Sequence, residues 1–190
     1  MATVQPIKSR DDLQKVRDIL KTNRDRALFT LGINTAFRGG DILSFNVGDV
    51  YRLTAGDELT RREQKTKKKR MVNLNEACIE ALKPLLAERK ADGASDAEPL
   101  FVSERGLGAG TRLTIRSLSR MWKAWCEAAG LEGNFGSHTG RKSFGYLQRT
   151  ERKVPIEVLQ KALNHSSPAT TLIYLGIQDA ELKDLYSANF

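Results

Sequence analysis

Residues 159–177, LQKALNHSSPATTLIYLGI, are the stretch that most restricts the fold of this 190-residue chain. Leu163-Asn164 is typical of a helix end, because asparagine tolerates the left-handed backbone conformation found there. Pro168 fits the first turn of a following helix, where proline is tolerated. The stretch therefore predicts helices over 155–163 and 168–175, with His165 in the tight connection and Tyr174 nine residues after it.

Two further sets of polar residues accompany this stretch. His138-Thr139-Gly140-Arg141 places histidine and arginine three apart, on one face at the start of a predicted helix. Upstream, Arg38 is followed by Gly39-Gly40, a pair expected to break or kink the preceding helix. Taken singly, each residue has an ordinary structural explanation, such as an exposed arginine or a packed tyrosine ring.

The basic residues are concentrated in one segment, 61–70 (RREQKTKKKR). It holds seven basic residues and one acidic residue, a net charge of +6 in a chain whose formal charge is +8. A local basic element of this kind is suited to phosphate contact, and Lys67, Lys68, Lys69 and Arg70 are expected to contact a nucleic-acid backbone. A solvated loop is the alternative explanation for the same run.

The hydrophobic pattern predicts a mainly α protein with a small antiparallel β-sheet, an α+β fold. Ser9, Asn23, Asn75 and Thr114 are predicted to cap helices. The predicted helices are 10–21, 24–37, 41–45, 76–91, 114–129, 138–150, 155–163, 168–175 and 179–188. Residues 1–190 are expected to form one domain: a lead-in and helix over 1–22, a sheet with the basic hairpin over 50–74, and a tail helix over 176–190.

Composition excludes several classes of protein. No apolar run approaches the roughly 20 residues that span a bilayer, and the N-terminus lacks the apolar stretch of a signal peptide. Cys78 and Cys126 lie far apart and in no CxxC motif, so neither a disulfide framework nor a zinc finger is indicated. With two histidines in the chain, no metal site is expected, and a cytoplasmic location is predicted.

Taken together, the polar sets resemble the active-site signature of the tyrosine recombinase (phage integrase) family. TAFRGGDILSFNVGDV (35–50) resembles the family's first-arginine box, EQKTKKKRMVNL (63–74) the hairpin that carries its lysine, and 159–177 its terminal box. The resemblance covers about residues 23–180 and implies the family's catalytic-domain fold. The residues it implies as catalytic are Arg38, Lys65, His138, Arg141, His165 and Tyr174. Only 37 residues precede Arg38, so the chain is expected to be a fragment or to resemble short members without an N-terminal core-binding domain.

Three positions depart from the family pattern. Leucine commonly precedes the second arginine and histidine follows it, whereas this chain has Gly140 and Lys142. Gly140 is expected to loosen packing under its helix, and Lys142 to add a positive charge near the phosphate. Asn164 replaces a common glycine and tolerates the same backbone conformation.

The resemblance also implies a mechanism and partners. Tyr174 would attack a DNA phosphate to form a 3′-phosphotyrosyl link, with no cofactor, while His138 accepts its proton, Lys65 protonates the leaving oxygen, and His165 and the two arginines bind the phosphate. The chain would act on double-stranded DNA as a homotetramer through a Holliday junction and be a monomer or weak oligomer when free. Accessory DNA-binding proteins are possible partners. The tail helix over 179–189 could dock on a neighbouring protomer or pack on its own.

Other interpretations are compatible with parts of the sequence. A type IB topoisomerase-like relaxation activity would use a similar residue set. A non-catalytic architectural DNA-binding protein could keep the same fold, and the basic run alone could be a targeting signal. Arg112, Arg116 and Arg120, spaced by four, are candidates for a DNA-facing stripe on one helix, with a solvated face as the alternative.

Overall fold

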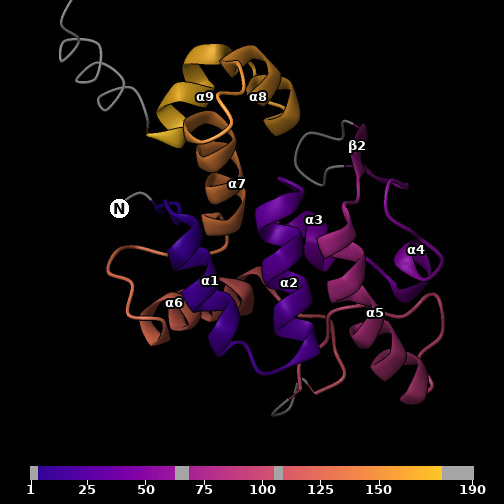
Figure 1. The fold of residues 1–190 in the computed structure, drawn as a ribbon. Coiled ribbons are helices and arrows are strands. Elements are labelled where there is room, and N and C mark those ends of the chain that lie inside the picture. Colours follow the sequence, from indigo (N-terminus) through magenta and orange to yellow (C-terminus); the bar gives the residue numbers. More distant parts are fainter. Residues whose placement is uncertain (1–3, 63–68, 105–108, 177–190) are drawn as a thin grey trace, which may run out of the picture.

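A computed structural model of the chain describes residues 4–62, 69–104 and 109–176. Its elements, in chain order, are α1 (Arg10–Ile19), α2 (Asn23–Asn34), α3 (Gly39–Leu43), α4 (Val47–Val50), β1 (Glu58–Arg62), β2 (Lys69–Asn73), α5 (Glu76–Ala91), α6 (Ile115–Ala128), α7 (Thr139–Thr150), α8 (Ile156–Leu163) and α9 (Pro168–Leu175). The predicted fold class, mainly helical with a small antiparallel sheet, is confirmed (Figure 1). The predicted tail helix lies outside the described residues. No helix in the described ranges is long and apolar enough to cross a membrane.

Side-chain caps fix where several helices begin. Ser9, Asn75 and Thr114 each accept a hydrogen bond from the backbone N–H three residues later, as predicted. The prediction for α2 is wrong by one residue, because Thr22 is the cap and accepts from the Asp25 N–H. Asn23 is instead the first residue of the helix.

The Gly39-Gly40 pair does not end α2, contrary to the sequence prediction. The helix ends at Asn34, and Ala36 then takes a left-handed conformation with φ of 52°. The two glycines begin α3. A Cβ at Gly39 would lie 2.7 Å from Cδ2 of Leu118 on α6, so glycine is needed there for close packing of α3 on α6.

The sheet consists, in the described residues, of β1 and β2 paired antiparallel, with Glu58 opposite Asn73 and Arg62 opposite Lys69. It is smaller than the predicted region 50–74, because Val50 is buried at the end of α4. The two ends of the basic run, Arg61–Arg62 and Lys69–Arg70, lie opposite each other on the two strands. Residues 63–68, which include Lys65, Lys67 and Lys68, lie outside the described residues.

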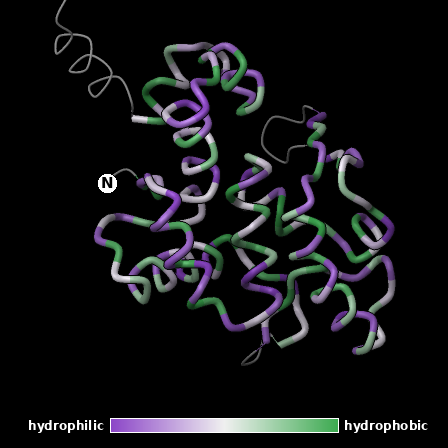
Figure 2. The backbone as a smooth tube through the Cα atoms, viewed as in Figure 1, coloured by the Kyte–Doolittle hydropathy of each residue, from purple (hydrophilic) through white to green (hydrophobic). Residues whose placement is uncertain are grey.

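The main core surrounds α2, which packs against α5 and α7. Phe29 of α2 contacts Trp122 and Trp125 of α6, with ring centroids 5.3 and 6.5 Å apart. Leu100 and Phe101, in the connection between α5 and α6, are fully buried. Hydrophobic and hydrophilic residues alternate along the helices (Figure 2), as expected of helices with one face in the core.

A second, smaller core joins α8 and α9 to the rest of the protein. It consists of Ala36, Leu159, Leu163 and Leu175, with Phe144 of α7 packed against it. Figure 1 shows α8 and α9 at one end of the molecule, next to the end of α7. The segment that carries His165 and Tyr174 is therefore positioned through contacts with α7 and with the connection between α2 and α3.

Candidate active site

Arg38 is the N-cap residue of α3, in extended conformation between Phe37 and Gly39. Phe37 is 1% exposed, and its ring packs against Phe45 at a centroid distance of 5.5 Å. The aromatic pair anchors the backbone on either side of the arginine. Arg38 therefore follows a residue that is fixed in the core.

The start of α7 supplies the next predicted residues. His138 is the N-cap and is exposed, whereas Arg141, 3% exposed, points inward. The Arg141 guanidinium donates hydrogen bonds to the carbonyl oxygens of Ala36 and Leu163. It thus joins the α2–α3 connection to the end of α8.

Gly140 does not loosen the packing under α7, contrary to the sequence expectation. A Cβ at this position would lie 2.7 Å from Cζ2 of Trp122 and 2.9 Å from the carbonyl carbon of Gly32. The two glycines let α7 and α2 approach closely, and the large indole of α6 fills the space beside them. The departure from the family pattern is compensated by Trp122.

The connection between α8 and α9 positions His165. Asn164 ends α8 in the left-handed conformation, with φ of 51° and ψ of 44°, which confirms the prediction. His165 Nδ1 lies 3.1 Å from the hydroxyl of Thr171, which is fully buried and also donates to the Ser167 carbonyl. Since that hydroxyl has one proton, His165 Nδ1–H is the donor towards Thr171. This leaves Nε2 facing away from Thr171.

Tyr174, on α9, lies between the two histidines. Its hydroxyl is 3.5 Å from His138 Nδ1, and its ring is edge-on to the His165 ring at a centroid distance of 4.8 Å. A hydroxyl–imidazole contact of this length is typical of a catalytic pair that tightens when substrate binds. The histidine–tyrosine spacing seen in the sequence therefore corresponds to direct contact in space.

The pKa of the Tyr174 phenol is raised, because the effect of its burial outweighs that of the positive charges around it. Burial raises the pKa of the phenol, whereas the charge and hydrogen bond of Arg141 and the charges of Arg38 and Arg70 lower it. The three arginines come from α7, the α3 N-cap and β2. A group with negative charge at this position, such as a phosphate, would be stabilised by all three.

Arg70 does not lie on the outer surface of the hairpin with the other basic residues predicted to contact DNA, and its own contact with DNA stays a prediction. Side chains alternate along β2, so Lys69 is exposed and Arg70 is turned inward, with 7% exposure. Its guanidinium lies 5.2 Å from the Phe37 ring centroid and donates to the carbonyl oxygens of Thr35 and Ala162. Arg70 thus joins the same two chain segments as Arg141.

The predicted stripe on α6 is wrong at Arg112. Thr114 caps the helix, so Arg112 precedes it, and its guanidinium donates to the carbonyl oxygens of Leu43 and Phe45 and to Oδ1 of Asn46. Burial lowers the pKa of Arg112. Arg116 and Arg120 are exposed on α6, and their contact with DNA stays a prediction.

Lys142 is also buried, although the sequence suggested a DNA contact. It is 6% exposed, and its Nζ lies 4.8 Å from the centroid of the Tyr174 ring. The structure thus brings His138, Arg141, Lys142 and His165 around Tyr174. Lys65 lies outside the described residues, so its position relative to these groups stays a prediction.

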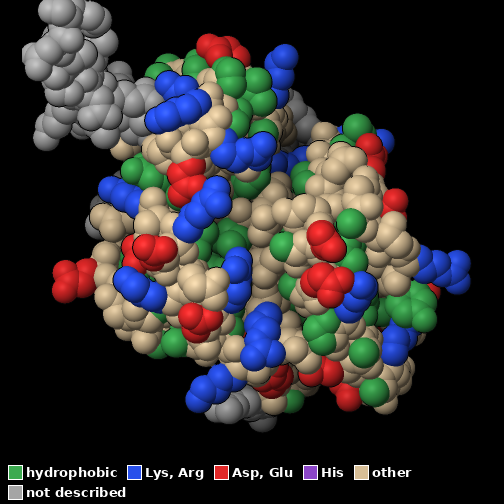
Figure 3. All heavy atoms as spheres, in the orientation of Figure 1, with side chains coloured by type: hydrophobic (Ala, Val, Ile, Leu, Met, Phe, Trp, Pro, Cys, Tyr) green, Lys and Arg blue, Asp and Glu red, His purple; other side chains and the backbone are tan. Residues whose placement is uncertain are grey.

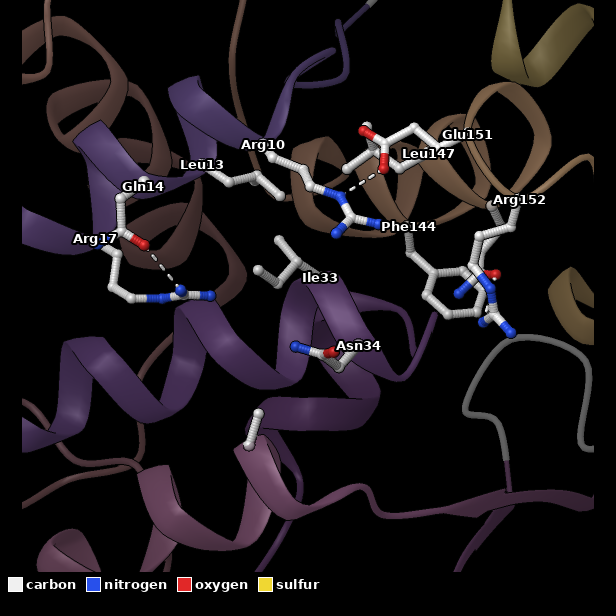
Figure 4. A pocket seen from close by; sticks show the side chains of 12 residues that line it. Arg10, Leu13, Gln14, Arg17, Ile33, Asn34, Phe144, Leu147, Glu151 and Arg152 are labelled. Carbon is white, nitrogen blue, oxygen red and sulfur yellow. Dashed lines mark hydrogen bonds and ion pairs between the residues drawn. The ribbon is translucent and has the colours of Figure 1, made fainter.

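A groove of about 410 Å³ lies elsewhere, between α1, α2 and α7. Figure 4 shows Arg10 and Arg17 of α1 on one side, and Phe144 of α7 and Glu151 at the C-cap of α7 on the other, with Arg10 Nε paired to Glu151 at 2.5 Å. None of the residues that line the groove belongs to the predicted catalytic set. On the face drawn in Figure 3, basic and acidic side chains are intermixed.

Three contributions to the site were not predicted from the sequence: Thr171, the inward Arg70, and the Lys142–Tyr174 contact. The alternation of side chains along a strand could have indicated that Arg70 points inward, because it precedes the apolar Val72 by two residues and so shares its face. Thr171 follows Ser167 by four residues in a helix, a spacing typical of back-bonding threonine. Within the described part of the chain, no group of three or more histidine, cysteine or acidic side chains is arranged to hold a metal ion.

Comparison with known proteins identifies the family. The model of the phage integrase family matches residues 9–181, so the chain belongs to this family.

Among curated relatives, the probable integrase/recombinase YoeC of Bacillus subtilis (strain 168) is 40% identical over 192 residues, which cover 98% of this chain and 97% of YoeC. Tyrosine recombinase XerC of Caldanaerobacter subterraneus subsp. tengcongensis is 32% identical, over 87% of this chain and 45% of XerC. The chain therefore spans about half the length of the XerC relative and nearly all of YoeC. These relatives identify the enzyme as a site-specific tyrosine recombinase.

Solved structures agree on the fold. XerA recombinase superposes with a TM-score of 0.76 at 22% identity, covering all of this chain and 66% of that one. XerH bound to its palindromic difH substrate, in a post-cleavage complex, gives a TM-score of 0.74 at 25% identity, over 98% of this chain and 53% of XerH. The arrangement of α and β elements is thus that of tyrosine recombinases.

Proposed function

We propose that this enzyme cuts and rejoins double-stranded DNA through a covalent link between Tyr174 and a 3′-phosphate. The observation that carries the proposal is the position of the Tyr174 hydroxyl. It lies 3.5 Å from His138 Nδ1 and interacts electrostatically with arginines from three separate segments. Such a site has the parts that phosphoryl transfer needs: a nucleophile, a proton acceptor beside it, and positive charges that stabilise the phosphate.

The reaction exchanges one phosphodiester for another. The Tyr174 Oη–phosphorus bond forms as the phosphorus–O5′ bond breaks, His138 accepts the phenol proton, and Lys65 gives a proton to the leaving 5′ oxygen. The DNA–protein link conserves the energy of the broken bond, so rejoining runs by the same steps in reverse. Lys65 takes its role from the family resemblance.

Arg38 and Arg141 would stabilise the charge that develops on the non-bridging phosphate oxygens. Loss of a donor of this kind costs about 3–4 kcal/mol in the transition state, or roughly 10²–10³ in rate. His165 would add a hydrogen bond from Nε2. Because its Nδ1–H already faces Thr171, Nε2 would donate this bond in the imidazolium form.

The partners follow from the same chemistry and from relatives. XerH is described on its difH substrate, and a lambda integrase structure is described as a tetramer bound to a Holliday junction. By analogy, this enzyme would act in the cytoplasm, as a homotetramer on two DNA sites. Contacts of the 179–189 segment with a neighbouring protomer, and a role for accessory proteins, belong to the same proposal.

Covalent trapping tests the central step. The full chain would be incubated with duplexes nicked a few nucleotides 3′ of candidate cleavage positions, so that the short 5′-hydroxyl fragment is lost and the adduct accumulates. A denaturing gel should show a protein–DNA band for the wild type and for the control Tyr146→Phe, and none for Tyr174→Phe. An adduct mapped by peptide sequencing to Tyr146 or Tyr186 would contradict the assignment. DNA binding without any adduct would favour the architectural alternative.

Two further variants test the basic hairpin. A substrate with sulfur at the 5′-bridging position needs no proton on its leaving group, so it should restore cleavage by Lys65→Ala. Restoration for Lys67→Ala instead would show that the lysine is misassigned. Neutralising Lys67, Lys68 and Lys69 together should lower the log–log salt slope of DNA binding by up to about 3, measured by fluorescence anisotropy.

A further inference from the structure

The contact between Lys142 and Tyr174 is not explained by the chemistry above. Lys142 follows Arg141 on α7, and its side chain turns onto the Tyr174 ring, with Nζ 4.8 Å from the ring centroid. The lysine is 6% exposed, so it is a buried cation rather than a mobile surface charge. It is held on the nucleophile before any DNA is present.

We propose that Lys142 is a positioning residue for Tyr174: its ammonium fixes the ring and stabilises the phenolate that forms when the tyrosine attacks and again when it leaves. The inference rests on the proposed role of Tyr174 as nucleophile. A cation over an aromatic face is attracted by the ring, and the attraction grows when the ring becomes anionic. It is also stronger in a desolvated site than at the surface.

The surroundings of both groups are consistent with this role. Burial lowers the pKa of Lys142 and raises the pKa of Tyr174, so both groups have lost hydration at their contact. Among the residues that the structure describes, the other titratable or charged groups that face Tyr174 are His138 at the N-cap of α7, Arg141 of α7, His165 before α9, Arg38 before α3 and Arg70 of β2. Lys142 differs from the arginines because its charge lies over the ring face, where it acts on the phenol and on its orientation.

A second cation–ring pair in the same chain supplies a matched control. Lys8 lies over Tyr146, with Nζ 5.9 Å from that ring centroid. The four tyrosines of the full chain would be replaced by 3-fluorotyrosine, which ionises at lower pH, and titrated by ¹⁹F NMR without DNA. Tyr174→Phe and Tyr146→Phe variants assign the two signals.

Lys142→Met should raise the pH midpoint of the Tyr174 signal by about one unit, whereas Lys142→Arg should leave it near the wild-type value. Lys8→Met should leave the Tyr174 midpoint unchanged. On trapping substrates at neutral pH, Lys142→Met should cleave about tenfold more slowly in a single turnover, and its rate should recover at higher pH. Its DNA affinity and salt slope should equal those of the wild type.

Three outcomes are decisive. An unchanged Tyr174 midpoint in Lys142→Met overturns the inference, and so does a shift that Lys142→Arg fails to prevent. A salt slope lowered by about one, with the midpoint unchanged, would show that Lys142 contacts DNA phosphate instead. A shifted midpoint with no wild-type adduct at Tyr174 supports the contact and overturns the proposed function, so the two failures are distinguishable.

Discussion

Gly140→Ala should destabilise the protein, although alanine is the better helix former. The added Cβ would lie 2.7 Å from Cζ2 of Trp122, 2.9 Å from the Gly32 carbonyl carbon and 3.0 Å from the Gly32 Cα. Backbone atoms of α2 cannot rotate away as a side chain can. Overpacking of this kind costs typically about 1–3 kcal/mol. Gly140 lies in the first turn of α7, where the gain in helix propensity is less than the roughly 1 kcal/mol of a helix interior.

The matched control is Gly145→Ala, on the same helix. Its Cβ would meet Cδ2 of Leu175 at 2.6 Å and Cδ1 of Leu163 at 3.4 Å, both ends of flexible side chains. Gly145 is in the helix interior, so it gains the full propensity and the methyl groups yield. We expect its free energy of unfolding to stay within about 1 kcal/mol of the wild type and that of Gly140→Ala to fall by about 2 kcal/mol.

Urea unfolding followed by circular dichroism would measure both variants, because the indole at the contact makes tryptophan fluorescence an unsuitable signal. Trp122→Phe, combined with Gly140→Ala in a double-mutant cycle, should recover part of the loss but not all, since the Gly32 backbone contact remains. If Gly140→Ala is as stable as Gly145→Ala, α2 and α7 are not in backbone contact and the reasoning fails.

Three further results are expected. Arg70→Met should lower the free energy of unfolding, measured in urea, by about 2–3 kcal/mol, because two buried carbonyl oxygens lose a charged donor. Arg70→Lys should not restore this stability, since an ammonium cannot bridge both carbonyl oxygens as the planar guanidinium does. Thr171→Val should slow single-turnover cleavage about tenfold without changing DNA affinity, because His165 loses its orienting partner. Burial raises the pKa of Cys78 and of Cys126 to about 12, so neither thiol should react with Ellman's reagent at pH 8 until urea is added. From about pH 9 to 12 the unfolded thiols ionise while the folded ones keep their protons, so the free energy of unfolding should fall across that range, as pH-dependent urea titrations would show.

The starts of α1, α5 and α6 and the end of α8 could be predicted because they depend on short-range chemistry. Ser9, Asn75 and Thr114 satisfy backbone N–H groups within one turn, and Asn164 takes a conformation open to few residues. The cap at Thr114 also implied that Arg112 precedes the helix. The error at Arg112 therefore came from reading spacing alone and neglecting a start signal that the same sequence supplied.

The packing of Gly140, Arg70 and Lys142 could not be predicted in the same way, because each depends on segments far apart in the chain. The need for glycine at position 140 arises from its contacts with Gly32 and Trp122, which belong to other helices. The direction of Arg70 depends on the hairpin register, which a shift of one residue would reverse. The residues of the catalytic signature could be recognised in the sequence, whereas the contacts that support them could be identified only from the folded structure.

The arginine contacts also affect how activity data must be interpreted. Arg141 and Arg70 both bridge the α2–α3 connection, at Ala36 and Thr35, to the end of α8. The residue expected to bind phosphate therefore also holds the segment that leads to His165 and Tyr174. An inactive Arg141→Ala could have lost either the phosphate charge or the position of α8. Arg70→Lys separates the two, because it removes a bridge to the same segments, keeps a positive charge at this position and leaves Arg141 in place. If Arg70→Lys keeps cleavage within about tenfold of the wild type while Arg141→Ala loses 10²–10³, the larger loss belongs to the phosphate.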